Sequence, residues 1–175
     1  MNIYFSGMIG SGKTTLGRSI ANRLSLPFFD LDAEMDRILG YSFHKLVAEK
    51  GWVPFRELEY SICKGFAGKQ GVLCCLGGGT VRYEWNIDVL SGTGVMVLLE
   101  VSPEELIRRV RQADRPRVNP GTTLEEDVRR MWSESKQKYY APADLIYRAE
   151  GKSTEEEVEE LIRLLRQQPG LEHLS

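Results

Sequence analysis

The chain has 175 residues, of which 42% are hydrophobic and 27% are charged, and its formal net charge is −2 at pH 7. This length suits a single domain over residues 1–175, and the composition excludes a disordered chain. With 23 basic residues against 25 acidic ones, the chain lacks the basic excess of a protein that coats nucleic acid, so we expect no nucleic-acid partner.

The length of the apolar runs indicates where in the cell the protein is expected to be found. None approaches the roughly 18 residues of a membrane span, and the first residues lack the basic segment and long apolar stretch of a signal peptide. We therefore expect a cytoplasmic protein with no membrane partner. Cys63, Cys74 and Cys75 lack the spacing of a zinc site and are expected to be reduced structural thiols of a core strand.

Five apolar segments have the length of β-strands, at residues 2–6, 27–30, 72–76, 95–101 and 145–148. Residues 95–99 show no polar alternation, which is typical of a strand covered on both faces in a parallel sheet. Helical patterns lie between the strands, and capping boxes, each with a glutamate three residues on, mark starts at Ser102, Thr123 and Ser153. This alternation predicts an α/β domain whose ligands bind beyond the carboxyl ends of the strands.

A phosphate-binding loop follows the first strand. Residues 7–14 read Gly-Met-Ile-Gly-Ser-Gly-Lys-Thr and match G-x-x-x-x-G-K-[ST] at every fixed position. Glycines let backbone amides turn inward around phosphate oxygens, and the next helix points its positive end at the same anion. The nucleotide site is predicted to use Gly10, Ser11, Gly12, Lys13, Thr14 and Thr15, with Lys13 at the terminal phosphates and the Thr14 hydroxyl on Mg²⁺.

An acidic pair, Asp30 and Asp32, ends the second strand on one face and at the same sheet edge. One carboxylate can hold Mg²⁺ while the other receives the proton of an acceptor hydroxyl. The alternative is that the two residues only end the strand and cap the next helix. No [NT]KxD segment is present to read guanine, and the chain is short for a motor, so a compact kinase with a small acceptor is favoured.

Three further features each have a functional and a purely structural interpretation. Arg56 and Glu59 share a helical face, where they bind a ligand or form a local ion pair. The triplet of Gly77, Gly78 and Gly79 follows the third strand, where a ligand can approach bare backbone or the chain simply turns. Five arginines in and before an irregular segment either face solvent or close over phosphates as a lid: Arg108, Arg109, Arg111, Arg115 and Arg117.

In their order along the chain, these motifs resemble the shikimate kinase family of small P-loop kinases. The resemblance runs from Met1 to about Leu165 and includes the P-loop, Asp-x-Asp, Phe-Arg-x-x-Glu, Gly-Gly-Gly, Arg-Pro and Tyr-x-x-x-Ala-Asp. It implies a three-layer P-loop kinase fold with a five-stranded parallel sheet in the order 2-3-1-4-5 and flanking helices. It also implies an acceptor-binding region at about 31–62 and a lid at about 111–123.

The resemblance further implies transfer of the γ-phosphoryl group of ATP, with Mg²⁺, to the 3-hydroxyl of shikimate. Separately, we expect a monomer. Lys13, Asp32 and Arg115 would be catalytic, with Arg115 moving from the lid toward the phosphates. Thr14 and Asp30 would hold the metal. The acceptor would be bound by Asp32 at its hydroxyl, by Arg56 at its carboxylate with Glu59 orienting Arg56, and by Gly77, Gly78 and Gly79.

One position departs from the family pattern. Counted back from Tyr139, Ala143 and Asp144, the family has an arginine that clamps the carboxylate of shikimate where this chain has Ser135. Lys136 and Lys138 lie nearby but lack the planar fork that a carboxylate prefers. The change leaves two alternatives open: a kinase of the same fold for another hydroxylated acceptor, and a noncatalytic nucleotide-binding module.

Overall fold

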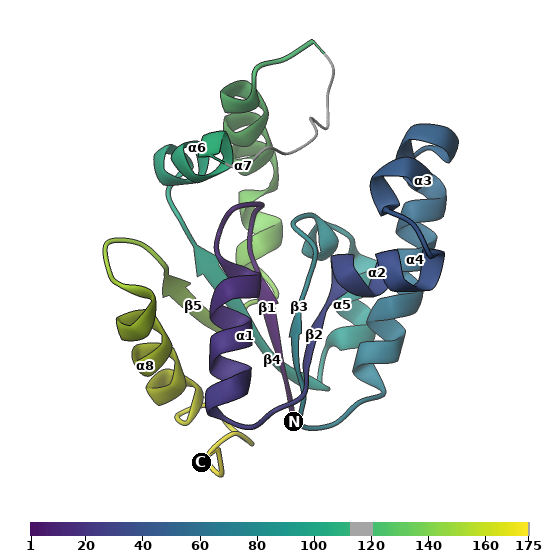
Figure 1. The fold of residues 1–175 in the computed structure, drawn as a ribbon. Coiled ribbons are helices and arrows are strands. Elements are labelled where there is room, and N and C mark those ends of the chain that lie inside the picture. The colour runs from purple at the N-terminus through teal and green to yellow at the C-terminus, as the bar shows by residue number, and fades with distance from the viewer. Residues whose placement is uncertain (113–120, 175) are drawn as a thin grey trace.

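The computed structural model describes residues 1–112 and 121–174 (Figure 1). Five parallel strands form one sheet in the order β2-β3-β1-β4-β5, which confirms the predicted topology. Each strand lies within one residue of its predicted segment, and the bounds are β1 Asn2–Ser6, β2 Phe28–Asp30, β3 Leu73–Cys75, β4 Gly94–Glu100 and β5 Leu145–Arg148. All five residues of β1 are buried, as its central place in the sheet requires.

Helices cover the sheet and extend beyond its carboxyl edge (Figure 1). Helix α1 (Lys13–Arg23) packs beside α8 (Thr154–Leu165), while α4 (Trp52–Ala67) packs against α5 (Glu84–Leu90). Helices α2 (Leu31–Leu39) and α3 (Phe43–Lys50) follow β2 and contact α4, and α6 (Pro103–Gln112) follows β4 and contacts α7 (Leu124–Tyr140). No helix within the described ranges is long and apolar enough to cross a bilayer.

The helix starts test the predicted capping boxes. Thr123 and Ser153 each form the complete box, with side chain and backbone bonds in both directions. The capping box predicted at Ser102 forms only in part: the side-chain bond of the serine is present, but the prediction that Glu105 bonds back to the serine amide was wrong. The Ser102 hydroxyl accepts from the Glu105 amide, but the Glu105 carboxylate binds arginines of its own helix, and the Ser102 amide donates to Glu150 Oε2 at 2.8 Å. The Ser102 amide therefore bonds to the carboxylate of Glu150 in place of that of Glu105.

The cysteines are buried and unpaired. Cys74 and Cys75 lie in β3 as expected, whereas the expectation of a strand position was wrong for Cys63, which lies in α4. Burial raises the pKa of Cys74 to about 12, so the thiol stays protonated at neutral pH. These side chains serve as small apolar filling of the core.

Helix α1, which follows the phosphate loop, is pressed against the sheet at Gly17. A Cβ on Gly17 would lie 2.5 Å from Cys75 Sγ and 3.1 Å from a Leu73 methyl carbon. Only a residue without a side chain lets α1 approach β3 this closely.

We expect Gly17→Ala to lower the free energy of unfolding by about 1 to 3 kcal/mol, because the extra methyl group overpacks the contact with β3. The control is Gly65→Ala in α4, where a Cβ meets nothing within 4 Å, so the helix should gain about 0.5 to 1 kcal/mol. Urea denaturation measures both variants. Equal effects of the two substitutions would contradict the close packing.

Candidate active site

The loop between β1 and α1 has the backbone of an anion cradle. Gly7, Gly10 and Gly12 have φ values of 145°, 81° and 92°, a region that side chains disfavour. A Cβ on Gly7 would lie 2.8 Å from the Leu99 carbonyl oxygen, so the first glycine is also required by a close approach to β4. The turn leads into the amino terminus of α1, where backbone N–H groups without helical partners can bind phosphate.

Lys13 is the first residue of α1 and is only 9% exposed. Its Nζ donates to the carbonyl oxygens of Gly7 and Met8 at 2.7 and 2.9 Å and to Ser11 Oγ at 3.4 Å. The ammonium group is thus held inside the loop, with Ser11 buried beside it. Thr14 and Thr15 follow in the first turn of α1 and are exposed.

Arg109 also lies at the phosphate loop. Its Nη1 donates to the Gly10 carbonyl at 3.4 Å, and a Cβ on Gly12 would lie 3.7 Å from the same nitrogen. Nη2 donates to the Ala149 carbonyl and Nε to Glu105, which fixes the guanidinium group. Sequence reasoning placed Arg109 among the arginines near the lid without assigning it to this loop, because the contact spans 99 positions in the chain.

Asp30 connects the phosphate loop to α2. Its Oδ2 accepts from the Thr14 hydroxyl at 2.6 Å, and its Oδ1 accepts from the Ala33 amide at 3.1 Å as the cap of α2. Asp30 therefore caps α2, as the structural interpretation predicts, and its other oxygen lies at the phosphate loop, where the functional interpretation places it. Thr14 and Asp30 present neighbouring oxygen ligands of the hard type that Mg²⁺ prefers.

Asp32 lies in the first turn of α2, because β2 ends at Asp30. The expectation that both carboxylates share one strand face was therefore wrong, although the helix still directs Asp32 to the site. Its pKa is raised to about 6, first by burial and then by the negative charge of Asp30, while the positive charge of Lys13 opposes the rise. The Asp32 carboxylate is thus within electrostatic reach of the Lys13 ammonium group.

Glu59 of α4 is a buried carboxylate, 1% exposed, and it is held by three donors. Arg56 Nη1 donates to it at 2.8 Å, Thr80 Oγ1 at 2.9 Å and Asn86 Nδ2 at 3.1 Å. The pair of Arg56 and Glu59 is therefore part of a buried network and not a solvated surface ion pair. This network fixes the guanidinium group of Arg56 against the turn after β3.

Aromatic rings surround Arg56. Its Cζ lies 4.3 Å from the ring centre of Tyr83, 4.8 Å from that of Phe55 and 5.4 Å from that of Trp52. Nε of Arg56 is buried and has no hydrogen-bond partner among the described residues. A guanidinium group that is stacked, oriented and only partly bonded is suited to bind a planar anion.

The glycine triplet joins the two halves of the site. A Cβ on Gly77 would lie 3.3 Å from Asp32 Oδ1, one on Gly78 would lie 3.2 Å from the Ile9 amide nitrogen, and one on Gly79 would lie 3.2 Å from Arg56 Nη2. Side chains at these positions would fill the space between the phosphate loop, Asp32 and Arg56. The triplet therefore does more than turn the chain.

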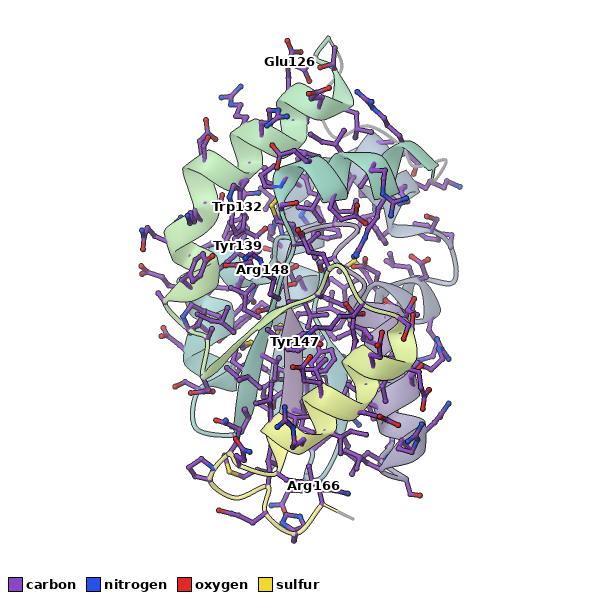
Figure 2. All side chains as sticks on the ribbon, turned by 90° about the vertical axis from the view of Figure 1, so that its left-hand side faces the viewer. Glu126, Trp132, Tyr139, Tyr147, Arg148 and Arg166 are labelled. Carbon is purple, nitrogen blue, oxygen red and sulfur yellow. The ribbon has the colours of Figure 1, made fainter. Side chains whose placement is uncertain are left out.

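Helix α7 closes this region from the other side. Trp132 and Tyr139 lie along α7 (Figure 2), and the Tyr139 hydroxyl donates to the Gly78 carbonyl at 2.5 Å. Ser135, one turn before Tyr139, is buried. Among the other arginines near the lid, Arg108 pairs with Glu105 and Arg111 with Glu125, while Arg115 and Arg117 lie outside the described residues together with most of the predicted lid.

The shikimate kinase family model matches residues 9–166, which is most of the chain. The chain belongs to the shikimate kinase family. It is 33% identical to a shikimate kinase of Chlorobium luteolum over 97% of this chain and 89% of that protein. It is 31% identical to a shikimate kinase of Pelotomaculum thermopropionicum over 98% of this chain and 99% of that protein.

A solved structure of the family agrees with this membership. The shikimate kinase of Acinetobacter baumannii, in complex with shikimate, superposes with a TM-score of 0.86 at 26% identity, covering 93% of this chain and 91% of that one. The five-stranded parallel sheet and flanking helices are therefore the fold of the shikimate kinase family. The phosphate loop, acidic pair, Arg56 network and glycine triplet of this member lie together at one edge of that sheet.

We expect Glu59→Gln to lower the free energy of unfolding by about 3 kcal/mol, because the amide NH₂ faces donors and the Arg56 charge loses its buried partner. The matched control is Glu57→Gln, an exposed position on the same helix, which should change stability by less than about 0.5 kcal/mol. Chemical denaturation followed by circular dichroism compares them. A loss below about 1 kcal/mol for Glu59→Gln would contradict the network.

Proposed function

We propose that the chain transfers the γ-phosphoryl group of ATP to a hydroxyl of shikimate, with the phosphate loop and the acidic pair as the two sides of one site. Membership of the shikimate kinase family makes the chain a phosphotransferase with an alcohol as acceptor. Two observations together carry the assignment of residues: Asp30 bonds to Thr14 in the first turn of α1, and Asp32 lies within electrostatic reach of Lys13.

On the nucleotide side, the amides around Gly10, Ser11 and Gly12 bind phosphate oxygens, and Lys13 neutralises negative charge at the transferred group. To do so, the Lys13 ammonium exchanges its bonds to loop oxygens for phosphate. Thr14 and Asp30 fit Mg²⁺ by their neighbouring oxygens and would hold it. When bound, Mg²⁺ neutralises charge on the β- and γ-phosphates. Thr15, in the same helical turn, faces the nucleotide.

On the acceptor side, Asp32 accepts a hydrogen bond from the reacting hydroxyl and orients its oxygen toward phosphorus. A bond forms between that oxygen and phosphorus as the bond from phosphorus to ADP breaks, and the hydroxyl proton passes to Asp32 and then to water. Arg56 binds the carboxylate of shikimate, with Glu59 holding its orientation. The bare backbone of Gly77, Gly78 and Gly79 leaves room for the acceptor ring.

Other parts of the proposal rest on sequence alone. We assign Arg115, which lies outside the described residues, to the lid that closes over the phosphates at about residues 111–123. We further propose a cytoplasmic monomer without a nucleic-acid or membrane partner; the near-balance of 23 basic and 25 acidic residues supports the absence of a nucleic-acid partner. Light scattering of the purified protein measures the oligomeric state, and a stable dimer would overturn that part.

Ser135 supports a second candidate, a kinase of the same fold for a different hydroxylated acceptor. The deciding experiment is ADP release with shikimate at several concentrations beside a panel of neutral polyols and other hydroxy acids. Saturable ADP release with shikimate supports the first proposal, whereas activity only with another alcohol supports the second. Nucleotide binding with no transfer to any acceptor would favour a noncatalytic module, against which the buried Arg56 network argues.

We expect Lys13→Met to lower kcat at least about a hundredfold, because the variant removes a charge that stabilises the transition state. Lys64→Met, an exposed position on α4, is the control and should keep wild-type kcat. Steady-state kinetics and circular dichroism of both variants check the outcome. A folded Lys13→Met protein with wild-type turnover would refute the role of Lys13.

The raised pKa of Asp32 predicts how activity depends on pH. Because the carboxyl group must be ionised to accept the proton, kcat/KM for shikimate should fall about tenfold per pH unit below about pH 6. Asp32→Asn should lower kcat by about a hundredfold or more and abolish this limb, while Asp88→Asn, an exposed change on α5, should keep it. If Asp32→Asn shows the same fall in kcat/KM below about pH 6 as the wild type, another group is responsible for that fall.

A further inference from the structure

Arg82 is a second arginine at the glycine triplet, and no motif of the sequence points to it. It ends the short 3₁₀ helix η1 (Thr80–Arg82), and its amide donates to the Gly79 carbonyl at 3.1 Å. The residue is half-buried. Within the described part of the chain, its guanidinium group makes no ion pair and no hydrogen bond, which is costly for a cation partly removed from water.

The surroundings of Arg82 connect it to Arg56. A cavity of about 330 Å³ is lined by Arg82, Tyr83, Glu84, Trp85 and Lys138. The Tyr83 ring, which forms one wall, also lies 4.3 Å from Arg56 Cζ. Tyr83 therefore contacts both the cavity that Arg82 lines and the face of the Arg56 guanidinium group.

Tyr139 provides a second link between the two arginines. Its hydroxyl is bonded to the Gly78 carbonyl, at the centre of the triplet. Burial raises the pKa of Tyr139 to about 12, and the positive charges of Arg82 and then Arg56 oppose that rise. Both guanidinium groups thus act on one phenolic oxygen beside Gly78, which places them around the same turn.

The charged side chains at this turn and in the cavity are three cations, Arg56, Arg82 and Lys138, and two carboxylates, Glu59 and Glu84, which leaves one cation over. The charge of Arg56 is matched by the buried carboxylate of Glu59. Glu84 lines the cavity but forms no ion pair with Arg82 in the described structure. The turn therefore presents an unmatched guanidinium beside a matched one, an arrangement that favours an acceptor with a single negative charge.

We propose that Arg82 binds the carboxylate of the acceptor together with Arg56, and so supplies the second cation that position 135 does not. This inference rests on the function proposed above and adds a specificity-determining residue to it. Ser135 lies one helical turn from Tyr139, and the positive charge of Arg82 acts on the hydroxyl of Tyr139. The clamp is assembled from η1 and α4, and Lys138 of α7 lines the same cavity as Arg82.

The test is Arg82→Gln, measured with shikimate and with its methyl ester, which lacks the negative charge. KM for shikimate should rise at least about tenfold, while kcat and KM for ATP change less than about twofold. KM for the methyl ester should not change, because the lost contact is to the carboxylate. Arg148→Gln, an exposed arginine of β5, is the control and should leave all of these values unchanged.

Two further variants make the result specific. Arg82→Lys keeps the charge but not the planar fork, so its KM for shikimate should lie between those of the wild type and Arg82→Gln. This variant also serves if Arg82→Gln does not fold. Ser135→Arg added to Arg82→Gln should restore part of the lost affinity, since it supplies a guanidinium from the neighbouring helix.

The outcomes separate this inference from the proposed function. If the wild type phosphorylates shikimate but Arg82→Gln leaves its KM unchanged, or raises KM equally for acid and ester, the role of Arg82 is refuted and the proposed function stands. If the wild type neither binds nor phosphorylates shikimate, both are refuted. A rise in KM confined to the acid, with partial recovery in the double variant, supports both.

Discussion

The candidate site depends on a buried carboxylate. Glu59 lies inside the domain at 1% exposure, where an unmatched charge would be strongly unfavourable, and three donors from three different elements compensate it. Arg56 comes from the same helix, Thr80 from η1 and Asn86 from α5. Satisfying this one charge therefore fixes the position of α4 relative to the turn after β3, and with it the direction of Arg56.

The same turn connects the acceptor side to the nucleotide side. Gly78 lies against Ile9 of the phosphate loop, and its carbonyl oxygen accepts a hydrogen bond from the Tyr139 hydroxyl of α7. A side chain at Gly78 would therefore push apart the phosphate loop, the turn after β3 and α7. The parallel sheet explains why they meet, because all its strands deliver their following loops to one edge. The chemistry of the site is thus a consequence of sheet topology combined with three adjacent residues that have no side chain.

Much of this was predictable from local sequence. The phosphate loop has fixed spacing, the strands are apolar runs, and two capping boxes formed as predicted, because each depends on residues close together in the chain. Interactions across the chain were not predictable in this way. The partners of Glu59 are 21 and 27 positions away, and the sequence suggested only its bond to Arg56. Arg82 belongs to no motif, the sequence placed Arg109 only in a cluster of arginines near the lid, and only the folded chain shows where the two residues lie.

Asp30 divides its two oxygens between two elements, with one accepting from Thr14 of α1 and the other capping α2. Helix α2 carries Asp32 in its first turn. A single side chain therefore links the helix that begins at the phosphate loop to the helix that carries Asp32. In the proposed site, a ligand that moved the Asp30 carboxylate would therefore also change the cap of α2 and, with it, the position of Asp32.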